Sequence, residues 1–335
     1  MTTSPSSDPP EGDRRAASAP IAAPERENPG VPRPLALITL ALASTSVGAL
    51  LADLYGLMSM ATFGRFITAP SLVALAVIGA SGSTNEELRR RIQIGAVAGV
   101  VGTIGYDLFR LPFVPLGLRL FAPIDSYGLL LADAGMASPA TNALGWFFHL
   151  SNGVTFGVMY AVVAARRHWG WGIAWAMVLE TAVVVSPFGR RYALAVQPAS
   201  LAAAYWGHLG FGYPLGLLVQ RFDRTRDELQ SVIRRPAAAT LAISSIVLLV
   251  WLEPWSTSAA RDEAGRLAAR SGVPTAVVVR DRFVPEWLRV ERGGCVHIVR
   301  NDAERRERQC FDDPGAHRVR EGTRPYSGGF VYVER

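Results

Sequence analysis

Residues 35–58 read LALITLALASTSVGALLADLYGLM, a block whose single charged residue is Asp53. A bilayer core about 30 Å thick needs roughly 20 apolar residues in one helix, so this block is long enough to cross it. Six further blocks approach that length: 63–82, 92–110, 143–164, 169–188, 199–219 and 236–252. The last block is the shortest, and Pro70 interrupts the second. The pattern predicts an α-helical multi-pass bundle of about seven helices over residues 35–252, embedded in a lipid bilayer.

The regions around these blocks have a different composition. Residues 1–34 are rich in Pro, Ser, Ala and charge and hold too little apolar surface to fold, so we expect a disordered tail. Residues 111–142 are apolar but broken by prolines, which favours an interfacial or re-entrant segment. Residues 253–273 suit a linker with a short helix, and residues 274–335 suit a small β domain.

Arginine supplies every basic side chain except histidine, because the sequence contains no lysine. Schiff-base chemistry with retinal or pyridoxal phosphate is therefore excluded. The net charge of +6 comes from short clusters between apolar blocks rather than from a continuous basic face, so we expect no nucleic-acid partner.

The arginines also predict the orientation in the membrane. If the N-terminus is cytoplasmic, fourteen arginines lie in inside segments and five in outside segments before the last helix. The positive-inside rule then places the N-terminus in the cytoplasm and residues after Trp255 outside it. We expect a bacterial inner membrane, with Trp251 and Trp255 at the outer interface.

Two apolar blocks share a motif that contains aspartate. VGALLADLYGL at 47–57 aligns without gaps with VGTIGYDLFRL at 101–111, which pairs Asp53 with Asp107. Two other blocks share histidine followed by glycine at +4 and +8: His149 with Gly153 and Gly157, and His208 with Gly212 and Gly216. This spacing puts a histidine above a groove where a second helix can approach closely.

These side chains fall at similar predicted depths in the outer half of the membrane. Glu180 lies at that depth too, and Asn152 lies one turn below His149. The sharper hypothesis is one shared polar site made by Asp53, Asp107, Asn152, His149, Glu180 and His208. The plainer alternative is that the aspartates are solvated caps and each histidine bonds a neighbouring helix.

No motif around these residues specifies a reaction, so the function stays open between several classes. The leading hypothesis is a non-enzymatic membrane module for transport or metal handling. The rivals are a membrane redox protein or enzyme that uses the same cluster, and a structural anchor for an exported domain. A divalent metal is a possible cofactor, while haem between His149 and His208 is disfavoured because paired histidines on two helices are common.

The C-terminal segment changes to alternating apolar residues. Leu288 with Val290, and Val296 with Ile298, place aliphatic side chains on one face of successive strands, as in a half-buried antiparallel sheet. The only cysteines, Cys295 and Cys310, both lie here, so an exported domain could join them in a disulfide. Free thiols are the alternative.

VVVRDRFVPEWLRVERGGCVHIVRND at 277–302 resembles the opening strands of a cupredoxin, and GFVYVE at 329–334 resembles its closing strand. The matching positions are Phe283, Pro285, Leu288, Val290, Gly294, Val296 and Asn301. The resemblance implies a small all-β, cupredoxin-like sandwich. The copper ligands of that family are missing, because His297, His317 and Cys310 lack its spacing. We therefore expect no type 1 copper site and an exported domain that covers the bundle or binds a protein partner.

Overall fold

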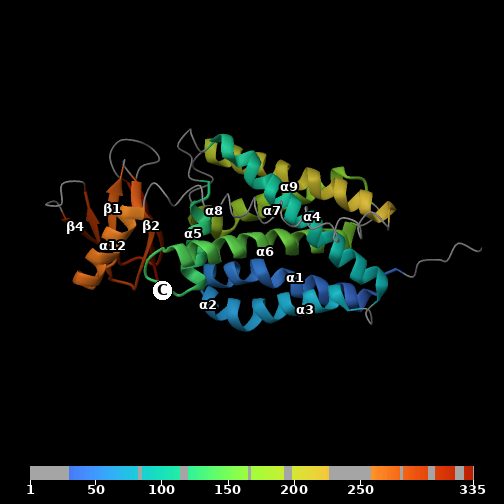
Figure 1. Ribbon diagram of the computed structural model, residues 1–335, viewed down its shortest axis with the longest axis horizontal. Coiled ribbons are helices and arrows are strands. Elements are labelled where there is room, and N and C mark those ends of the chain that lie inside the picture. The colour runs from blue at the N-terminus through green and yellow to red at the C-terminus, as the bar shows by residue number, and fades with distance from the viewer. Residues whose placement is uncertain are drawn as a thin grey trace, which may run out of the picture. The chain divides into compact units, whose positions relative to one another are not determined.

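The computed structural model describes residues 30–81, 85–113, 120–164, 167–191, 198–225, 258–279, 282–300, 306–320 and 328–334. By its contacts the chain divides into Met1–Gly30 and one compact unit, Val31–Arg335. That unit consists of a helical region followed by a β region (Figure 1). The predicted disordered tail and the predicted seventh helix at 236–252 lie outside the described residues, apart from the last few positions of the tail.

Up to residue 225, the described residues form nine α-helices and two short helical turns. They are α1 Arg33–Leu54, α2 Met60–Phe63, a π-helical turn Gly64–Thr68, α3 Ala69–Ala80, α4 Glu86–Arg110 with a following 3-10 turn Leu111–Phe113, α5 Ala122–Leu131, α6 Pro139–Ala164, α7 Gly170–Val185, α8 Pro187–Arg191 and α9 Pro198–Arg224, where the two turns continue the helices beside them.

Within the described residues, four stretches are long and apolar enough to cross a membrane: Arg33–Leu54, Met60–Ala80, Glu86–Phe113 and Pro139–Ala164. α7 is apolar but shorter, and α9, with 27 residues, is not among these four stretches. Large apolar side chains such as Phe66, Val73, Phe147 and Val178 are exposed on these helices, as expected for surfaces that face lipid. The described residues therefore contain a membrane-compatible helical bundle.

Several helix boundaries differ from the predicted blocks. The first helix ends at Leu54 rather than residue 58, where Gly56 adopts a positive φ of 68° that helical geometry does not allow. α4 begins at Glu86, six residues before the predicted block, because the Asn85 side chain accepts a hydrogen bond from the Leu88 N–H at 2.9 Å. Pro70 does not end the second helix, since a π-helical turn leads directly into α3.

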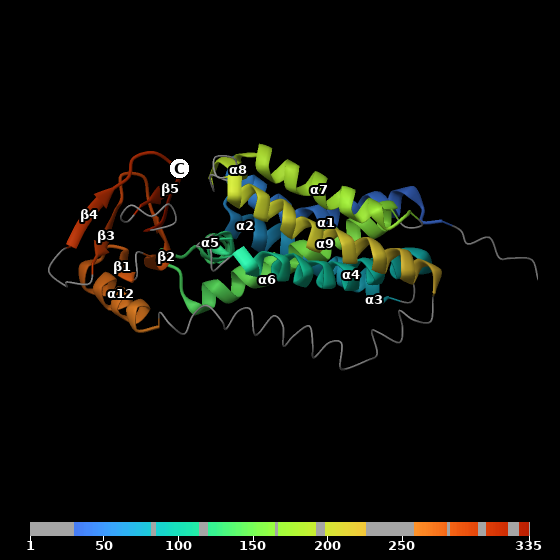
Figure 2. The same ribbon diagram turned by 90° about the horizontal axis from the view of Figure 1, so that it is seen from above.

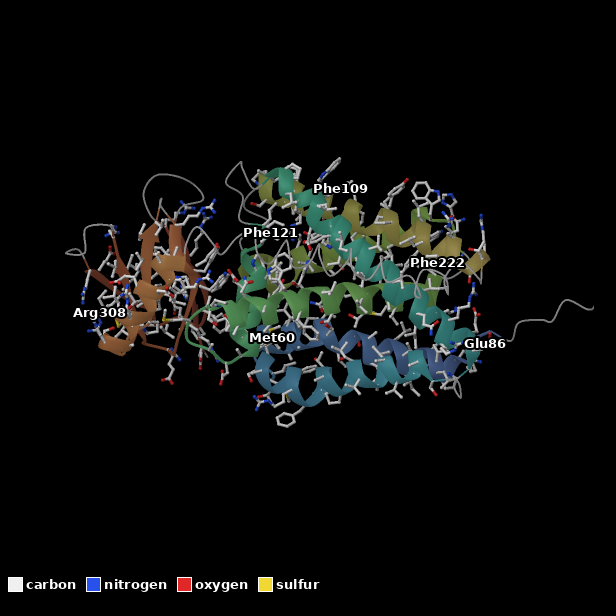
Figure 3. The ribbon with its side chains drawn as sticks, in the orientation of Figure 1. Met60, Glu86, Phe109, Phe121, Phe222 and Arg308 are labelled. Carbon is white, nitrogen blue, oxygen red and sulfur yellow. A yellow bond between two sulfur atoms is a disulfide. The ribbon has the colours of Figure 1, made fainter. Side chains whose placement is uncertain are left out.

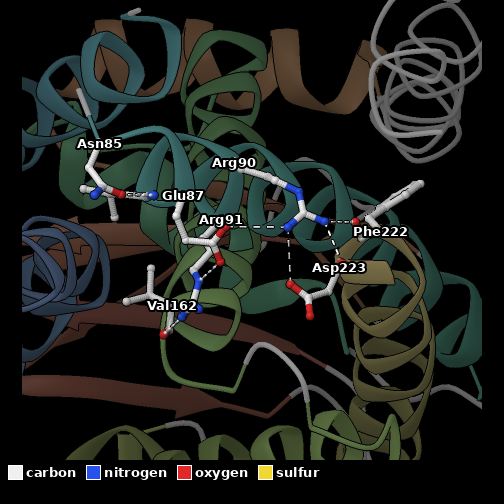
Figure 4. Close-up of polar contacts among 8 residues, drawn as sticks. Asn85, Glu87, Arg90, Arg91, Val162, Phe222 and Asp223 are labelled. Carbon is white, nitrogen blue, oxygen red and sulfur yellow. Dashed lines mark hydrogen bonds and ion pairs between the residues drawn. The ribbon is translucent and has the colours of Figure 1, made fainter. Parts of the chain in front are cut away.

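The early start of α4 brings three arginines, predicted as loop residues, into the helix. Arg91 contacts the Glu87 carboxylate at 2.9 Å and donates to the Val162 carbonyl of α6 at 3.0 Å (Figure 4). Arg90 donates to the Asp223 carbonyl of α9 at 2.8 Å and also to the Phe222 carbonyl. This network ties one end of α4 to both α6 and α9.

α4 lies alongside α6 and α9 over most of its length, as Figures 1 and 2 show. Glycines make this approach possible, because a Cβ added at Gly95 would lie 2.6 Å from the Gly157 carbonyl of α6. A Cβ at Gly210 of α9 would lie 2.6 Å from the Gly105 carbonyl of α4. The groove predicted beside His149 is therefore present at the α4–α6 crossing. The groove predicted beside His208 faces α7 instead of α4, because a Cβ added at Gly212 would lie 2.6 Å from the Gly172 carbonyl oxygen.

The predicted interfacial segment contains α5, which packs closely on α6. Cβ atoms added at either Gly128 or Gly145 would collide with backbone atoms of the other helix. The depth of α5 in a membrane stays a prediction.

The β region begins with α12 (Ser258–Ser271), where a short helix was predicted, and α12 packs on β1 and β2 (Figure 1). The strands are β1 Thr275–Val279, β2 Arg282–Val290, β3 Cys295–Val299, β4 Arg306–Cys310, β5 Gly315–Val319 and β6 Gly328–Val333. They form one six-stranded sheet in the order β4-β3-β1-β2-β6-β5.

The predicted antiparallel arrangement is wrong for two pairs of strands. β1 is parallel to β3 and β2 is parallel to β6, so the sheet is mixed. Alternation of apolar residues reports which face of a strand is buried, but it does not report the direction of the neighbouring strand. The described strands also follow one continuous hydrogen-bonded order rather than two separate sheets.

The predicted disulfide is confirmed. Cys295 of β3 and Cys310 of β4 lie directly opposite each other in the sheet and are bonded. Cys310 is therefore not a free thiolate that could bind copper.

The β region also contacts the helical region directly. The segment after α5 exchanges backbone hydrogen bonds with β2, including the Arg289 N–H to the Gly135 carbonyl at 2.8 Å. Trp287 and Phe330 stack with ring centroids 4.5 Å apart, and both belong to a buried cluster that includes Leu54 and the fully buried Met60 (Figure 3).

Candidate functional site

The structure brings four of the six predicted site residues into one group. Asp107 with His149, and Glu180 with His208, form two pairs that both adjoin Tyr106. Sequence reasoning missed two further members, Tyr106 and Arg110. We call Tyr106, Asp107, Arg110, His149, Glu180 and His208 the polar cluster.

The first pair joins α4 to α6. The His149 Nε2 lies 3.1 Å from each carboxylate oxygen of Asp107, and the Asp107 residue is only 2 % exposed. The helices are held close enough for this contact by Gly99 and Gly153, which face each other one to two turns away. A buried carboxylate is costly unless it is paired, so the imidazole stabilises it.

The second pair joins α7 to α9. The His208 Nδ1 lies 3.1 Å from Glu180 Oε2 and 3.0 Å from the Ala204 carbonyl oxygen. A carbonyl oxygen can only accept, so Nδ1 carries a hydrogen, and in the neutral ring Nε2 is then an acceptor. Glu180 is 2 % exposed, and its Oε1 has no hydrogen-bond partner among the described residues.

Tyr106 and Arg110 connect the two pairs. The Tyr106 ring centroid lies 5.8 Å from that of His149 and 4.8 Å from that of His208. The Arg110 guanidinium carbon lies 4.5 Å from the centre of the Tyr106 ring and 4.6 Å from that of Phe121, whose side chain is shown in Figure 3. The Arg110 Nη1 lies 3.6 Å from Asp107 Oδ1. Arg110 therefore adds one buried positive charge to the cluster.

Asp53 and Asp107 do not share a site, although they match in the repeated motif. Asp53 Oδ2 accepts a hydrogen bond from the Tyr332 hydroxyl of β6 at 3.0 Å, and Oδ1 accepts from the Met60 N–H at 3.3 Å. Asp53 thus connects the helical and β regions, while Asp107 lies within the bundle.

Asn152 has a connecting role between helices. Its Oδ1 accepts a hydrogen bond from the Ser46 hydroxyl of α1 at 2.6 Å. Asn152 also lines the cavity described next, one turn from His149.

A cavity of about 500 Å³ lies against the polar cluster. Tyr106, Arg110, His149, Glu180 and His208 reach its wall, and the remaining lining is mainly aliphatic and aromatic. This volume falls within the range of about 300–1,000 Å³ that small-molecule sites occupy, and a mostly apolar wall with few polar groups is typical of such sites.

Metal binding requires more ligands than the cluster brings together. Among the described residues no group of three or more His, Cys, Asp or Glu side chains could hold a metal ion. Each carboxylate in the cluster instead meets one imidazole, an arrangement suited to proton exchange and hydrogen bonding.

No family model matches this sequence, and no characterised protein or solved structure matches it.

Proposed function

We propose that this chain is an integral membrane protein that binds a small organic molecule in the cavity and couples its transport to proton exchange. One observation supports this most strongly: two buried histidine–carboxylate pairs, Asp107–His149 and Glu180–His208, adjoin one largely apolar cavity in the helical bundle. Ionisable groups in membrane helices are costly and often mark substrate or proton pathways.

The chemistry of the pairs favours proton coupling. Imidazole gains and loses a proton near physiological pH, and each imidazole here contacts a carboxylate that can stabilise its charged form. A bound molecule that forms hydrogen bonds with His208 or Glu180 would change how readily these groups hold a proton. Ligand binding and protonation are then linked.

An organic ligand fits this site better than the metal considered from the sequence. The two imidazoles are directed to different carboxylates, and neither pair gains a third ligand among the described residues. A passive anchor would also have no need for a buried arginine and two buried carboxylates.

The arrangement in the membrane is part of the proposal. Seven helices with a cytoplasmic N-terminus place the β region, with its resemblance to a cupredoxin that lacks copper ligands, outside the cytoplasm of a bacterial cell. The arginine distribution supports this orientation. The Cys295–Cys310 disulfide fits an oxidising compartment. An impermeant maleimide should label these cysteines in intact cells only after reduction.

Proton-linked transport can be tested with a neutral amphipathic alcohol, undecanol, added to proteoliposomes that contain a pH-sensitive dye. Undecanol that crosses the lipid unaided carries no proton, so a change of lumen pH reports coupled transport. We expect wild-type vesicles to show a pH change that the double variant His149→Gln, His208→Gln abolishes. His168→Gln is the matched control, because His168 is exposed and lies before α7. An equal pH change in wild type and double variant would refute the proposal.

A further inference from the structure

We infer that the ligand is an amphipathic acid whose anionic head lies between Arg110 and Arg318, so that the β region completes the binding site. The inference rests on the proposed function, because it assigns the ligand of the same cavity. It adds the chemical class of the head and a role for the C-terminal region.

The charge of the cavity wall indicates which charge the head group of the ligand carries. The charged side chains among its described lining residues are Arg110, Arg318 and Glu180, which give a formal charge of +1 with neutral histidines. Asp107 lies behind this wall, where it contacts His149 and Arg110. An anion therefore complements the wall better than a neutral or cationic head.

The Arg110 side chain is positioned to bind an oxyanion. Arg110 is 6 % exposed, and its Nε has no hydrogen-bond partner among the residues that the structure describes. The contacts of its guanidinium carbon with the Tyr106 and Phe121 rings hold the planar group in place. Guanidinium presents parallel N–H donors that match a carboxylate or phosphate, so an anion here would satisfy a buried donor.

Arg318 approaches from the β region. It lies on β5 directly opposite Phe330 of β6, and both residues line the cavity. Directly opposite residues of antiparallel strands project from the same face of a sheet. Phe330 stacks on Trp287 in the cluster that joins the helical and β regions, which fixes this face of the sheet against the cavity.

The apolar part of the ligand follows from the aliphatic and aromatic residues that line the rest of the cavity. α1 contributes Val47, Leu50, Leu51 and Leu54, which recur at the spacing of one helical face. Phe156 of α6 and Leu179 of α7 also line the cavity. A hydrocarbon body against these side chains, with its acid near the arginines, matches the distribution of polar and apolar groups.

Head-group preference can be measured with three dansyl-labelled probes that share an undecyl chain and end in a carboxylic acid, an alcohol or an amine. Binding to purified protein is followed by the rise in dansyl fluorescence. We expect the acid to bind wild type roughly ten- to a hundredfold more tightly than the alcohol, the range for hydrogen bonds to a charged group. Arg110→Gln and Arg318→Gln should each weaken acid binding while leaving alcohol binding unchanged.

Alcohol binding in each variant also reports that the cavity is still folded. The matched controls are Arg65→Gln in the helical region and Arg308→Gln on β4 (Figure 3), because both residues are exposed and neither lines the cavity. Equal binding of acid and alcohol, or tighter binding of the amine, would overturn the acid head group. An effect of Arg110→Gln without one of Arg318→Gln would overturn the role of the β region. Failure of all three probes to bind wild type would instead overturn the proposed function itself.

Discussion

Replacing Gly210 by alanine should separate α9 from α4 and weaken the site together with the fold. A Cβ at this position would lie 2.6 Å from the Gly105 carbonyl oxygen and 2.6 Å from Phe109 Cγ. Tight Cβ contacts in proteins begin at 3.0 Å and become ordinary at 3.4 Å, so the helices must move apart by about 0.4–0.8 Å. Forced overpacking of this kind costs about 1–3 kcal/mol.

Gly48→Ala is the matched control, because Gly48 also lies inside a bundle helix. Its added Cβ would meet only the Phe63 side chain, at 3.4 Å, an ordinary contact. Gly48→Ala should therefore keep or slightly raise the free energy of unfolding, since alanine favours helix by up to about 1 kcal/mol over glycine. Gly210→Ala should lower it by about 1–3 kcal/mol.

Two measurements check this prediction. Unfolding in mixed detergent, followed by tryptophan fluorescence, gives the free energy for wild type and both variants. Probe binding gives the effect on the site, because Gly210 is two residues from His208 and its partner Gly105 adjoins Tyr106. We expect Gly210→Ala to weaken binding and Gly48→Ala to leave it unchanged. Equal stability of the two variants would refute direct backbone contact between α4 and α9.

Three other perturbations test the remaining features. A double-mutant cycle of Tyr332→Phe with Asp53→Ala should give a coupling of about 1.5–3 kcal/mol for a hydrogen bond to a charged group, and no coupling in thermal unfolding would contradict the contact. Reduction of Cys295–Cys310, separated by 15 residues, should destabilise the β region by about 3 kcal/mol, and an unchanged unfolding transition with reductant would argue against this. Burial raises the pKa of the Asp125 carboxyl and outweighs the opposing effects of its polar neighbours, so the free energy of unfolding should fall as pH rises through that pKa. Asp125→Asn should flatten this fall, which unfolding curves across pH would reveal.

The sequence predicted the helical bundle, the following β region and the disulfide because each depends on local pattern. Long apolar blocks report helices that can face lipid, and alternation reports strands. Boundaries were less accurate where a side-chain cap decided them, as Asn85 does for α4. Strand direction was missed at β1 and β3, since pairing across the sheet depends on the path of the chain rather than on local alternation.

Parts of the site could be predicted because the histidines came with glycines. Gly153 and Gly212 are required for close helix packing, and each follows its histidine by one turn. The glycines therefore predict that His149 and His208 each face a neighbouring helix. No glycine spacing of this kind accompanies the two aspartates, so the repeated motif did not predict which residues they contact. Asp53 meets Tyr332 and Asp107 meets His149, because the partners of these carboxylates come from distant parts of the chain.

Arg110 shows why an arginine at the end of an apolar block is ambiguous in sequence. The orientation prediction counted Arg110 among the five outside arginines, whereas the structure buries it beside Asp107, Tyr106 and Phe121. Removing it from that count leaves the predicted orientation intact, since the bias toward inside arginines grows. The sequence does place Arg110 three residues after Asp107, a spacing that allows an ion pair on one helix. Such a pair is common at helix surfaces, and only its burial in the structure distinguishes this one. A buried arginine is costly unless its charge is paired and its N–H groups are hydrogen-bonded. The proposed acidic ligand would bond the Arg110 Nε, which has no partner among the described residues.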